Sequence, residues 1–481
     1  MISTPCRVAA ATLALSLAGC VSGPDYHLPA NAMAAAPEAG RAFVSSQSAA
    51  YTQAEPADRW WQLYDDPRLD AYVTEALRAN TDLRAADANL RRASAVVLQY
   101  RAQGAPSTEA SASGTLTHAG GYTQPSASPQ VYALGIQLSY PLDLAGGIRR
   151  GIEAASADAE AVAAARDQVR VVVAAAVTRA YVGICSSNDT LAATRRVLDT
   201  QRATLDATVR LAAGGRGTDF DVSRARAAVN RSAAAVPRLL AERQAALFEL
   251  AALMGRAPAN YPQDVADCPQ PPRLRHAIPV GDGWHLLQRR PDLRAAERTL
   301  AAATATIGVE TAGLYPQVSI GASAGMANAF RHLLSSNSVG ASIGPLLSWR
   351  WPDRRMARAR IDAAGAAADA ALAAFDGAVL DALRQTETAL SAYSQEIERE
   401  HSLALARDDA ARASGQAGQL YRFGRVGFID VLAAEAALAD AESALAASRS
   451  QQVDRQVDVF LALGGGWTDA DTIAGAASRL R

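Results

Sequence analysis

The residue types that most often carry catalysis or bind metals are scattered in this sequence. Its six histidines show no His-Glu-x-x-His or other metal-ligand spacing; they are His27, His118, His276, His285, His332 and His401. The sequence also contains no serine nucleophile elbow and no phosphate-binding P-loop. These observations argue against an enzyme, and they predict neither a metal nor a cofactor.

One cysteine lies where a covalent modification is expected. Arg7 and the apolar run from Val8 to Ala18 are typical of a signal peptide. The sequence Leu17-Ala18-Gly19-Cys20 that follows resembles a bacterial lipobox. In this interpretation residues 1–19 are removed and Cys20 is acylated, for example with palmitate, which anchors the chain to membrane lipid without spanning it. The alternative is an ordinary signal peptide cleaved nearby, with Cys20 incidental.

The rest of the chain is built from two similar halves. The sequence Asp-Leu-Arg-Ala-Ala occurs at residues 82–86 and again at 292–296. The same shift of about 210 residues places Pro106 on Pro316 and Phe220-Asp221-Val222 on Ile429-Asp430-Val431. Because the matches keep their order, they indicate a tandem duplication of a unit of about 200 residues.

Charge and hydropathy exclude two classes of protein. The net charge of −1 and the pI of about 6.6 show no basic footprint for nucleic acid. After the N-terminus we find no window with the roughly 20 apolar residues of a membrane-spanning helix. We therefore expect neither nucleic acid as a partner nor a helical membrane span.

The distribution of proline predicts two very long helices. No proline occurs between Pro141 and Pro237 or after Pro352, and both regions are rich in alanine. We expect helices from Arg149 to Leu211 and from Arg355 to about Tyr421, each about 95–100 Å long. Helices of this length imply a coiled coil.

Glycine-containing turns divide these regions into hairpins. Each long helix ends in such a turn, at residues 214–217 and 424–427, and a returning helix of about 38 residues follows. Shorter single helices are expected earlier in each half, at Pro67–Gln103 and Trp284–Gly313.

Four segments alternate between apolar and small polar residues. In the clearest, Tyr132, Leu134, Ile136, Leu138 and Tyr140 oppose Ala133, Gly135, Gln137 and Ser139. The others are Ser107–Thr117, Gln317–Met326 and Ser338–Trp349. A period of two predicts strands, and it fits a membrane β-barrel as well as a soluble two-sided sheet. The lipobox and the long helices favour the barrel.

Four strands cannot close a barrel, because an open sheet edge in lipid leaves backbone groups unpaired. Chains must therefore pool their strands. Two chains would supply eight strands with a filled interior, and three would supply twelve with a lumen.

Several ordered motifs identify a family. Gly23-Pro24-Asp25-Tyr26 follows Cys20, and Trp60-Trp61 precedes Asp66-Pro67-Arg68-Leu69. Arg289-Arg290-Pro291-Asp292 continues to Glu297, and the second half closes with Leu463-Gly464-Gly465-Gly466-Trp467. With these motifs the chain resembles the TolC/OprM-type outer membrane factor family, in its lipoprotein branch, which includes NodT-like efflux proteins.

The resemblance implies an α+β membrane protein that forms a homotrimer, with a twelve-strand β-barrel in the outer membrane and a twelve-helix tunnel in the periplasm. It implies the passive exit duct of a tripartite efflux pump for drugs or other small toxic solutes. A periplasmic adaptor and an inner membrane transporter, usually of the resistance–nodulation–division type, are the implied partners.

The expected organisation has six parts. Residues 1–19 are the signal peptide, and 20–65 are a lipidated segment that wraps a collar around the tunnel. Residues 66–255 and 283–464 are the two repeats. Residues 256–282 link them at the collar, and 465–481 form a C-terminal tail.

The resemblance also assigns roles at the hairpin ends. The turns should meet the adaptor through Gly214, Gly215, Arg216, Gly217, Gly424, Arg425, Val426 and Gly427. Tyr421 and Arg422 match a closing constriction of the family, whose usual acidic residue is here Ala433. Asp430 or Glu435 is the expected substitute, and the alternative is that all these residues are solvated tip residues.

Within this implied fold, Cys185 and Cys268 should form a disulfide. Cys185 lies near the middle of the first long helix, and Cys268 lies in the proline-rich linker at the same height. The periplasm is oxidising, so two free thiols there invite pairing. The alternative is two unpaired, buried thiols.

Two rival functions remain outside the enzyme class. A purely structural periplasmic coiled-coil lipoprotein would not need four alternating strands. A type I protein-secretion duct is the closest alternative, but its typical members lack a lipobox.

Overall fold

The computed structural model describes residues 21–116, 130–332, 335–349 and 354–465, and every structural statement below refers to these residues. The chain forms two compact units by its internal contacts. One unit comprises the chain up to Ala32 with Ala88–Ala163 and Arg294–Asp376. The other comprises Met33–Asp87, Ala164–Leu293 and the chain from Gly377 onward.

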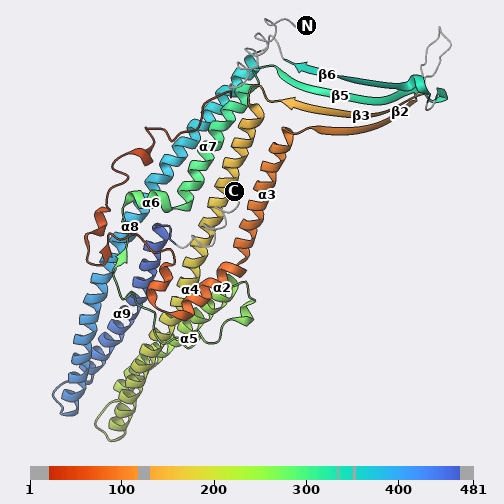
Figure 1. Cartoon of the computed structure of the whole chain (residues 1–481). Coiled ribbons are helices and arrows are strands. Elements are labelled where there is room, and N and C mark those ends of the chain that lie inside the picture. Colours follow the sequence, from red (N-terminus) through yellow and green to blue (C-terminus); the bar gives the residue numbers. More distant parts are fainter. Residues whose placement is uncertain (1–20, 117–129, 333–334, 350–353, 466–481) are drawn as a thin grey trace. The chain divides into compact units, whose positions relative to one another are not determined.

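The same order of elements occurs twice (Figure 1). The first half contains α2 (Pro67–Ala79), α3 (Thr81–Gln103), β2 (Ser107–Leu116), β3 (Gln130–Leu142), α4 (Gly147–Ala213) and α5 (Asp219–Leu253). The second contains α6 (Gly283–Arg289), α7 (Pro291–Ala312), β5 (Gln317–Ala329), β6 (Val339–Ser348), α8 (Arg355–Arg422) and α9 (Phe428–Ala462). Short strands β1 (Tyr51–Thr52) and β4 (Ile278–Pro279) pair in parallel.

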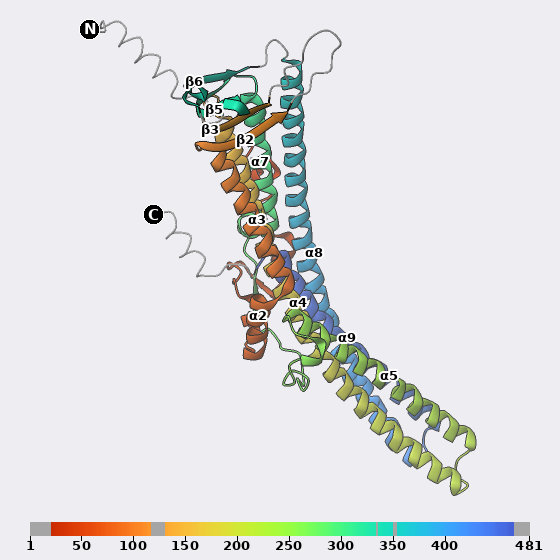
Figure 2. The same ribbon diagram turned by 90° about the vertical axis from the view of Figure 1, so that its right-hand side faces the viewer.

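The two long helices are confirmed. α4 has 67 residues and α8 has 68, so each is about 100 Å long at the rise of an α-helix. α5 returns beside α4, and α9 returns beside α8 (Figure 2). Polar contacts join the helices: Arg449 of α9 donates to Glu400 of α8 at 3.1 Å, and Arg243 of α5 donates to Asn188 of α4 at 3.3 Å.

The expectation that no stretch after the N-terminus is apolar enough for a membrane-spanning helix was wrong, whereas the absence of a helical span stays a prediction. α4 and α8 each contain an 18-residue stretch that is long and apolar enough to cross a membrane by composition alone. In α4, 67% of this stretch is buried within the protein, and in α8 17% is buried.

The two shorter helices were also predicted incorrectly, because each is divided in two. Arg290 separates α6 from α7 with an extended backbone, since the residue before Pro291 disfavours the helical region. Asn80 separates α2 from α3. Its side-chain oxygen accepts from the backbone N–H groups of Asp82 at 2.9 Å and Leu83 at 3.1 Å, so it caps the new helix.

The four longer strands form one antiparallel sheet in the order β2-β3-β5-β6. All four predicted strands are therefore confirmed, each within a few residues of its expected ends. The strands from the two halves meet where β3 pairs with β5.

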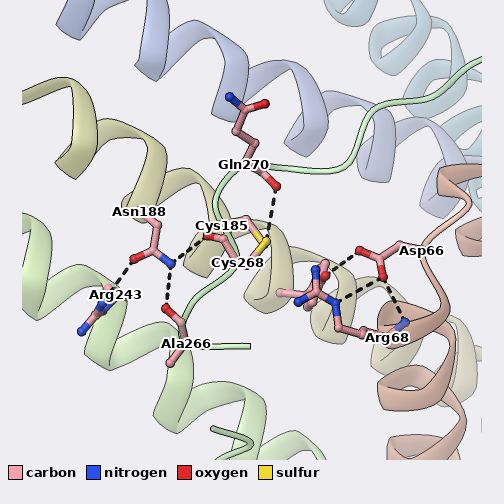
Figure 3. The surroundings of a disulfide bond; sticks show 9 residues. Asp66, Arg68, Cys185, Asn188, Arg243, Ala266, Cys268 and Gln270 are labelled. Atoms are coloured by element: carbon pink, nitrogen blue, oxygen red, sulfur yellow. Dashed lines mark hydrogen bonds and ion pairs between the residues drawn. A yellow bond between two sulfur atoms is a disulfide. The ribbon is translucent and has the colours of Figure 1, made fainter. Parts of the chain in front are cut away.

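The linker between the halves is tied to α4 by a covalent bond and by an asparagine (Figure 3). Cys185 and Cys268 form a disulfide with a Cα–Cα distance of 4.9 Å, the pairing that we expected. One turn further along α4, the Asn188 amide donates to the carbonyl oxygens of Ala266 at 2.8 Å and Cys268 at 2.9 Å. Both cysteines are buried.

Breaking this disulfide should lower stability. The two cysteines are 83 residues apart, and for a loop of this length the chain-entropy model sets an upper bound of about 4 kcal/mol. We expect the Cys185→Ala/Cys268→Ala variant to lose about 2–4 kcal/mol of unfolding free energy in denaturant titrations. Reductant should destabilise the wild type and leave the variant unchanged, whereas equal midpoints under oxidising conditions would contradict a stabilising bond.

Candidate functional site: the sheet face, the hairpin ends and a polar cavity

The apolar faces of the four strands coincide on one side of the sheet. Pairing aligns their apolar residues in rows, such as Ala110, Ile136, Ala324 and Ala341, or Ala112, Leu134, Met326 and Val339. The opposite side carries small and polar rows, such as Glu109, Gln137, Ser323 and Ser342, or Ser111, Gly135, Gly325 and Gly340. Large side chains on the apolar side are exposed, with Ile136 at 61% and Ile343 at 81%. A face of this kind needs an apolar environment.

The sheet also has two free edges. Within the described part of the chain, β2 and β6 each pair with only one neighbouring strand. Their outer backbone N–H and C=O groups are available to another strand. In lipid these groups would have no alternative partner, so the sheet cannot enter a membrane without further strands.

The two hairpin ends share one backbone motif. Gly215 and Gly424 both adopt positive φ, +71° and +67°, which allows the long helix to end in a tight turn. The following residues close the turn in the same way: Arg216 N–H donates to the Leu211 carbonyl at 2.8 Å, and Arg425 N–H donates to the Leu420 carbonyl at 2.9 Å. The repeat therefore extends to individual hydrogen bonds.

An aspartate caps the returning helix at each end. Asp221 accepts from the backbone N–H of Thr218 at 3.3 Å, and the Thr218 hydroxyl accepts in return from the N–H of Asp221 at 3.2 Å. Asp430 accepts from the backbone N–H of Gly427 at 2.9 Å. Both carboxylates lie in the first turn of their helix, where the helix dipole favours negative charge.

The structure separates the residues expected to form a gate. The Tyr421 ring packs against Phe428 with centroids 5.6 Å apart, and Arg422 is exposed. In the part of the chain that the structure describes, Arg422 forms no ion pair with Asp430 or Glu435. Asp430 caps α9, while Glu435 is buried. Pairing of Arg422 with a carboxylate therefore stays a prediction, and a single chain does not bring the groups together.

Glu435 lies in a polar cavity inside the helical unit. The cavity measures about 210 Å³ and lies among α4, α5 and α9. The Thr204 hydroxyl donates to the Glu435 carboxylate at 2.6 Å. Burial raises the pKa of the Glu435 carboxyl above its ordinary value, and the hydrogen bond from Thr204 opposes this shift.

A buried arginine holds the start of the described chain. Arg150 is 3% exposed and donates to the carbonyl oxygens of Ser22 at 3.1 Å and Gly23 at 3.3 Å. It also pairs with Asp25 at 2.6 Å. The backbone of Gly23 also packs closely against that of Gly308, because a Cβ on Gly23 would lie 2.4 Å from the Cα of Gly308. We did not anticipate Arg150 from the sequence, although Gly23-Pro24-Asp25-Tyr26 already marked the segment that it binds.

Some expected groups lie outside the described residues. Cys20 is among them, and the segment described begins at Val21, whose neighbour Ser22 donates its N–H to the Ala145 carbonyl at 3.0 Å. Among the residues described, no group of three or more histidine, cysteine or acidic side chains is arranged to hold a metal.

Comparison with known proteins gives a consistent result. A family model described as outer membrane efflux protein matches the chain twice, at residues 72–256 and 285–465. Nodulation protein T of Rhizobium leguminosarum bv. viciae is 27% identical and aligns over 99% of this chain and 98% of its own length. The solvent efflux pump outer membrane protein SrpC of Pseudomonas putida is 28% identical over 94% of this chain and 97% of its own length. The solved outer-membrane channel OprN has a TM-score of 0.86 at 34% identity, covering 93% of this chain and 100% of that chain.

A charge on the apolar sheet face should prevent stable insertion into a membrane. Ile136→Arg places a guanidinium in the middle of that face, at a cost of about 2–4 kcal/mol per chain if the face contacts lipid. We expect a large loss of protein in purified outer membranes. Ser111→Arg, one strand away on the opposite face, is the matched control and should insert normally. Equal amounts of the two variants in the membrane would contradict a lipid-facing role.

The buried Glu435 should make stability depend on pH. Because its pKa is raised in the folded state, the folded protein binds the proton more tightly than the unfolded chain does. The resulting stabilisation is present at low pH and is lost as pH rises through the raised pKa. In buffers without divalent cations, the stability of Glu435→Gln should therefore fall less than that of the wild type between about pH 4 and pH 7. Glu242→Gln, exposed on α5, should behave like the wild type, and parallel profiles for all three proteins would contradict the shift.

Proposed function

The chain belongs to the family of outer membrane efflux proteins, and we propose that it is the outer membrane exit duct of a tripartite efflux pump. In this role it conducts drugs or other small toxic solutes passively from the periplasm to the outside. An inner membrane transporter supplies the energy, and the duct supplies only a path across the outer membrane. We assign no catalytic step to this chain.

The observation that carries the proposal is the sheet. It combines a continuous apolar face with a polar face and two free edges. Three chains pairing β6 of one with β2 of the next would close twelve strands and leave no edge in lipid. The apolar side would then face lipid, and the row containing Glu109 and Gln137 would face a water-filled lumen.

The helical hairpins support the second half of the proposal. Each chain contributes four helices, α4 with α5 and α8 with α9, so three chains supply twelve helices for a periplasmic tunnel. The turns at 214–217 and 424–427 lie at the ends of these hairpins and are exposed over most of their length. They are the surfaces that we propose for a periplasmic adaptor, which would join the duct to a transporter of the resistance–nodulation–division type.

We further propose the boundaries given by the repeat. Residues 66–255 and 283–464 are the repeats, 256–282 is the linker, and 465–481 is a tail. Residues 1–19 are a removable signal peptide, and 20–65 begin with a lipidated Cys20. The hydrogen bonds from Arg150 support an anchor at Cys20, because they hold Ser22 and Gly23 against the residues that follow β3.

Conductance across a planar lipid bilayer tests the duct. The purified wild type should form discrete, long-lived channels, and a protein that forms none would refute the proposal. If Arg422 closes the tunnel by pairing with a carboxylate of a neighbouring chain, Arg422→Ala should raise single-channel conductance several-fold. The exposed Arg238→Ala on α5 serves as the control. If Arg422→Ala still forms channels and their conductance is unchanged, the role of Arg422 in closing the tunnel is refuted, while the proposal that the protein conducts solutes still stands.

A further inference from the structure

Three buried oxygen atoms without a hydrogen-bond partner lie along the cavities between α4 and α9. They are Glu435 Oε2, Glu442 Oε2 and Gln201 Oε1. In the described chain, these are the only carboxylate or amide oxygens among the buried side-chain atoms that lack a partner. All three residues line the same pair of adjoining cavities. Buried acceptors are normally satisfied, so their clustering in one place calls for a donor or a cation.

The side chains are held by the helices on which they lie. Glu435 and Glu442 are seven residues apart on α9, which places them two turns apart on one face. Gln201 and Thr204 lie on α4, opposite this face. Thr204 donates to Glu435 Oε1 at 2.6 Å, which orients the carboxylate and leaves Oε2 without a partner. Glu435 is 8% exposed and Gln201 6%, so the acceptors are largely removed from water.

The charges around the cavity favour a cation. Its lining contains the acidic residues Glu435, Asp440 and Glu442 and the basic residues Arg196 and Arg231. Both arginines are exposed, and in the described chain neither forms an ion pair with these acids. Water screens an exposed guanidinium, while the buried carboxylate oxygens are screened much less. The buried part of the lining therefore carries net negative charge.

We propose that this cavity binds a hard divalent cation, Ca²⁺ or Mg²⁺, held by Glu435 and Gln201, with Glu442, two turns further along α9, contributing through bound water and its charge. Oxygen ligands suit both ions, and Mg²⁺ in particular is often held by one or two carboxylates while it keeps several waters. The cavity of about 210 Å³ has room for such waters, each of which occupies roughly 30 Å³. The threonine hydroxyls of Thr190 and Thr194 line the same space and can accept from those waters.

A cation at this position joins α4 of the first hairpin to α9 of the second. It neutralises the buried carboxylates, which otherwise disfavour the folded state when they are ionised. Protons compete with the cation for Glu435, so binding should weaken as pH falls. The proposal does not depend on conduction, because binding is measured on the purified protein whether or not it forms channels.

The experiment uses the full-length protein purified in detergent and freed of metals with a chelator. Isothermal titration calorimetry with CaCl₂, and separately with MgCl₂, measures binding, and thermal unfolding at each concentration gives a second readout. We expect one saturable site per chain with a dissociation constant of about 10⁻⁴–10⁻³ M, and a rise in Tm as the site fills. Glu442→Gln and Gln201→Leu should each weaken binding about tenfold or more, whereas Glu242→Gln on α5 should bind as the wild type does.

The variants separate the possible results. Glu442 is only half-buried, so Glu442→Gln keeps the test valid if Glu435→Gln fails to fold. Circular dichroism without added metal checks that each variant is folded. Titration of the wild type without saturable binding up to about ten times the expected dissociation constant would overturn the proposal. It would also be overturned if both folded variants, Glu442→Gln and Gln201→Leu, bound with wild-type affinity, since the measured site would then lie elsewhere.

Discussion

The unpaired backbone groups at the two sheet edges are the constraint on which the rest of this protein depends. β2 and β6 each have one strand neighbour within the described chain, and the sheet between them exposes a continuous apolar face. A large apolar face is unfavourable in water. Unpaired backbone groups at the sheet edges are unfavourable in lipid, so neither solvent suits the sheet of a single chain. Strands added by other chains would satisfy both conditions, which supports the proposed assembly.

The long helices α4 and α8 each continue over about 100 Å without a break. Alanine dominates α4 and α8, and it favours the helix while allowing neighbouring helices to approach closely. The turns at Gly215 and Gly424 then end both helices through the same left-handed backbone conformation. Polar side chains inside such a bundle are costly unless they are paired. Around Glu435, burial raises the pKa of the carboxyl, so the stability of this part of the bundle should depend on pH.

Three attachments hold the irregular segments against the helices. Arg150 binds the first described residues through backbone carbonyls and Asp25, the disulfide joins Cys268 to α4, and Trp60 stacks on Phe460 with centroids 4.7 Å apart. Each attachment uses a different interaction, and each fixes a segment that has little regular secondary structure. The three attachments restrict the segments that they join, and Arg150 in addition satisfies two backbone carbonyl groups that would otherwise need water.

The sequence by itself determined the features that follow from local periodicity and from missing prolines. The alternation of Tyr132–Tyr140 predicted a strand and its apolar face, and the proline-free regions predicted α4 and α8 almost to their ends. The breaks at Asn80 and Arg290 were also encoded locally, by a capping side chain and by Pro291, but the surrounding helical pattern concealed them. Only the tertiary structure decided which side chains meet across large separations. Arg150 binds residues more than 120 positions away, and Glu435 faces Thr204 across 231 positions. Such contacts depend on how helices pack, and no periodicity within one segment contains that information.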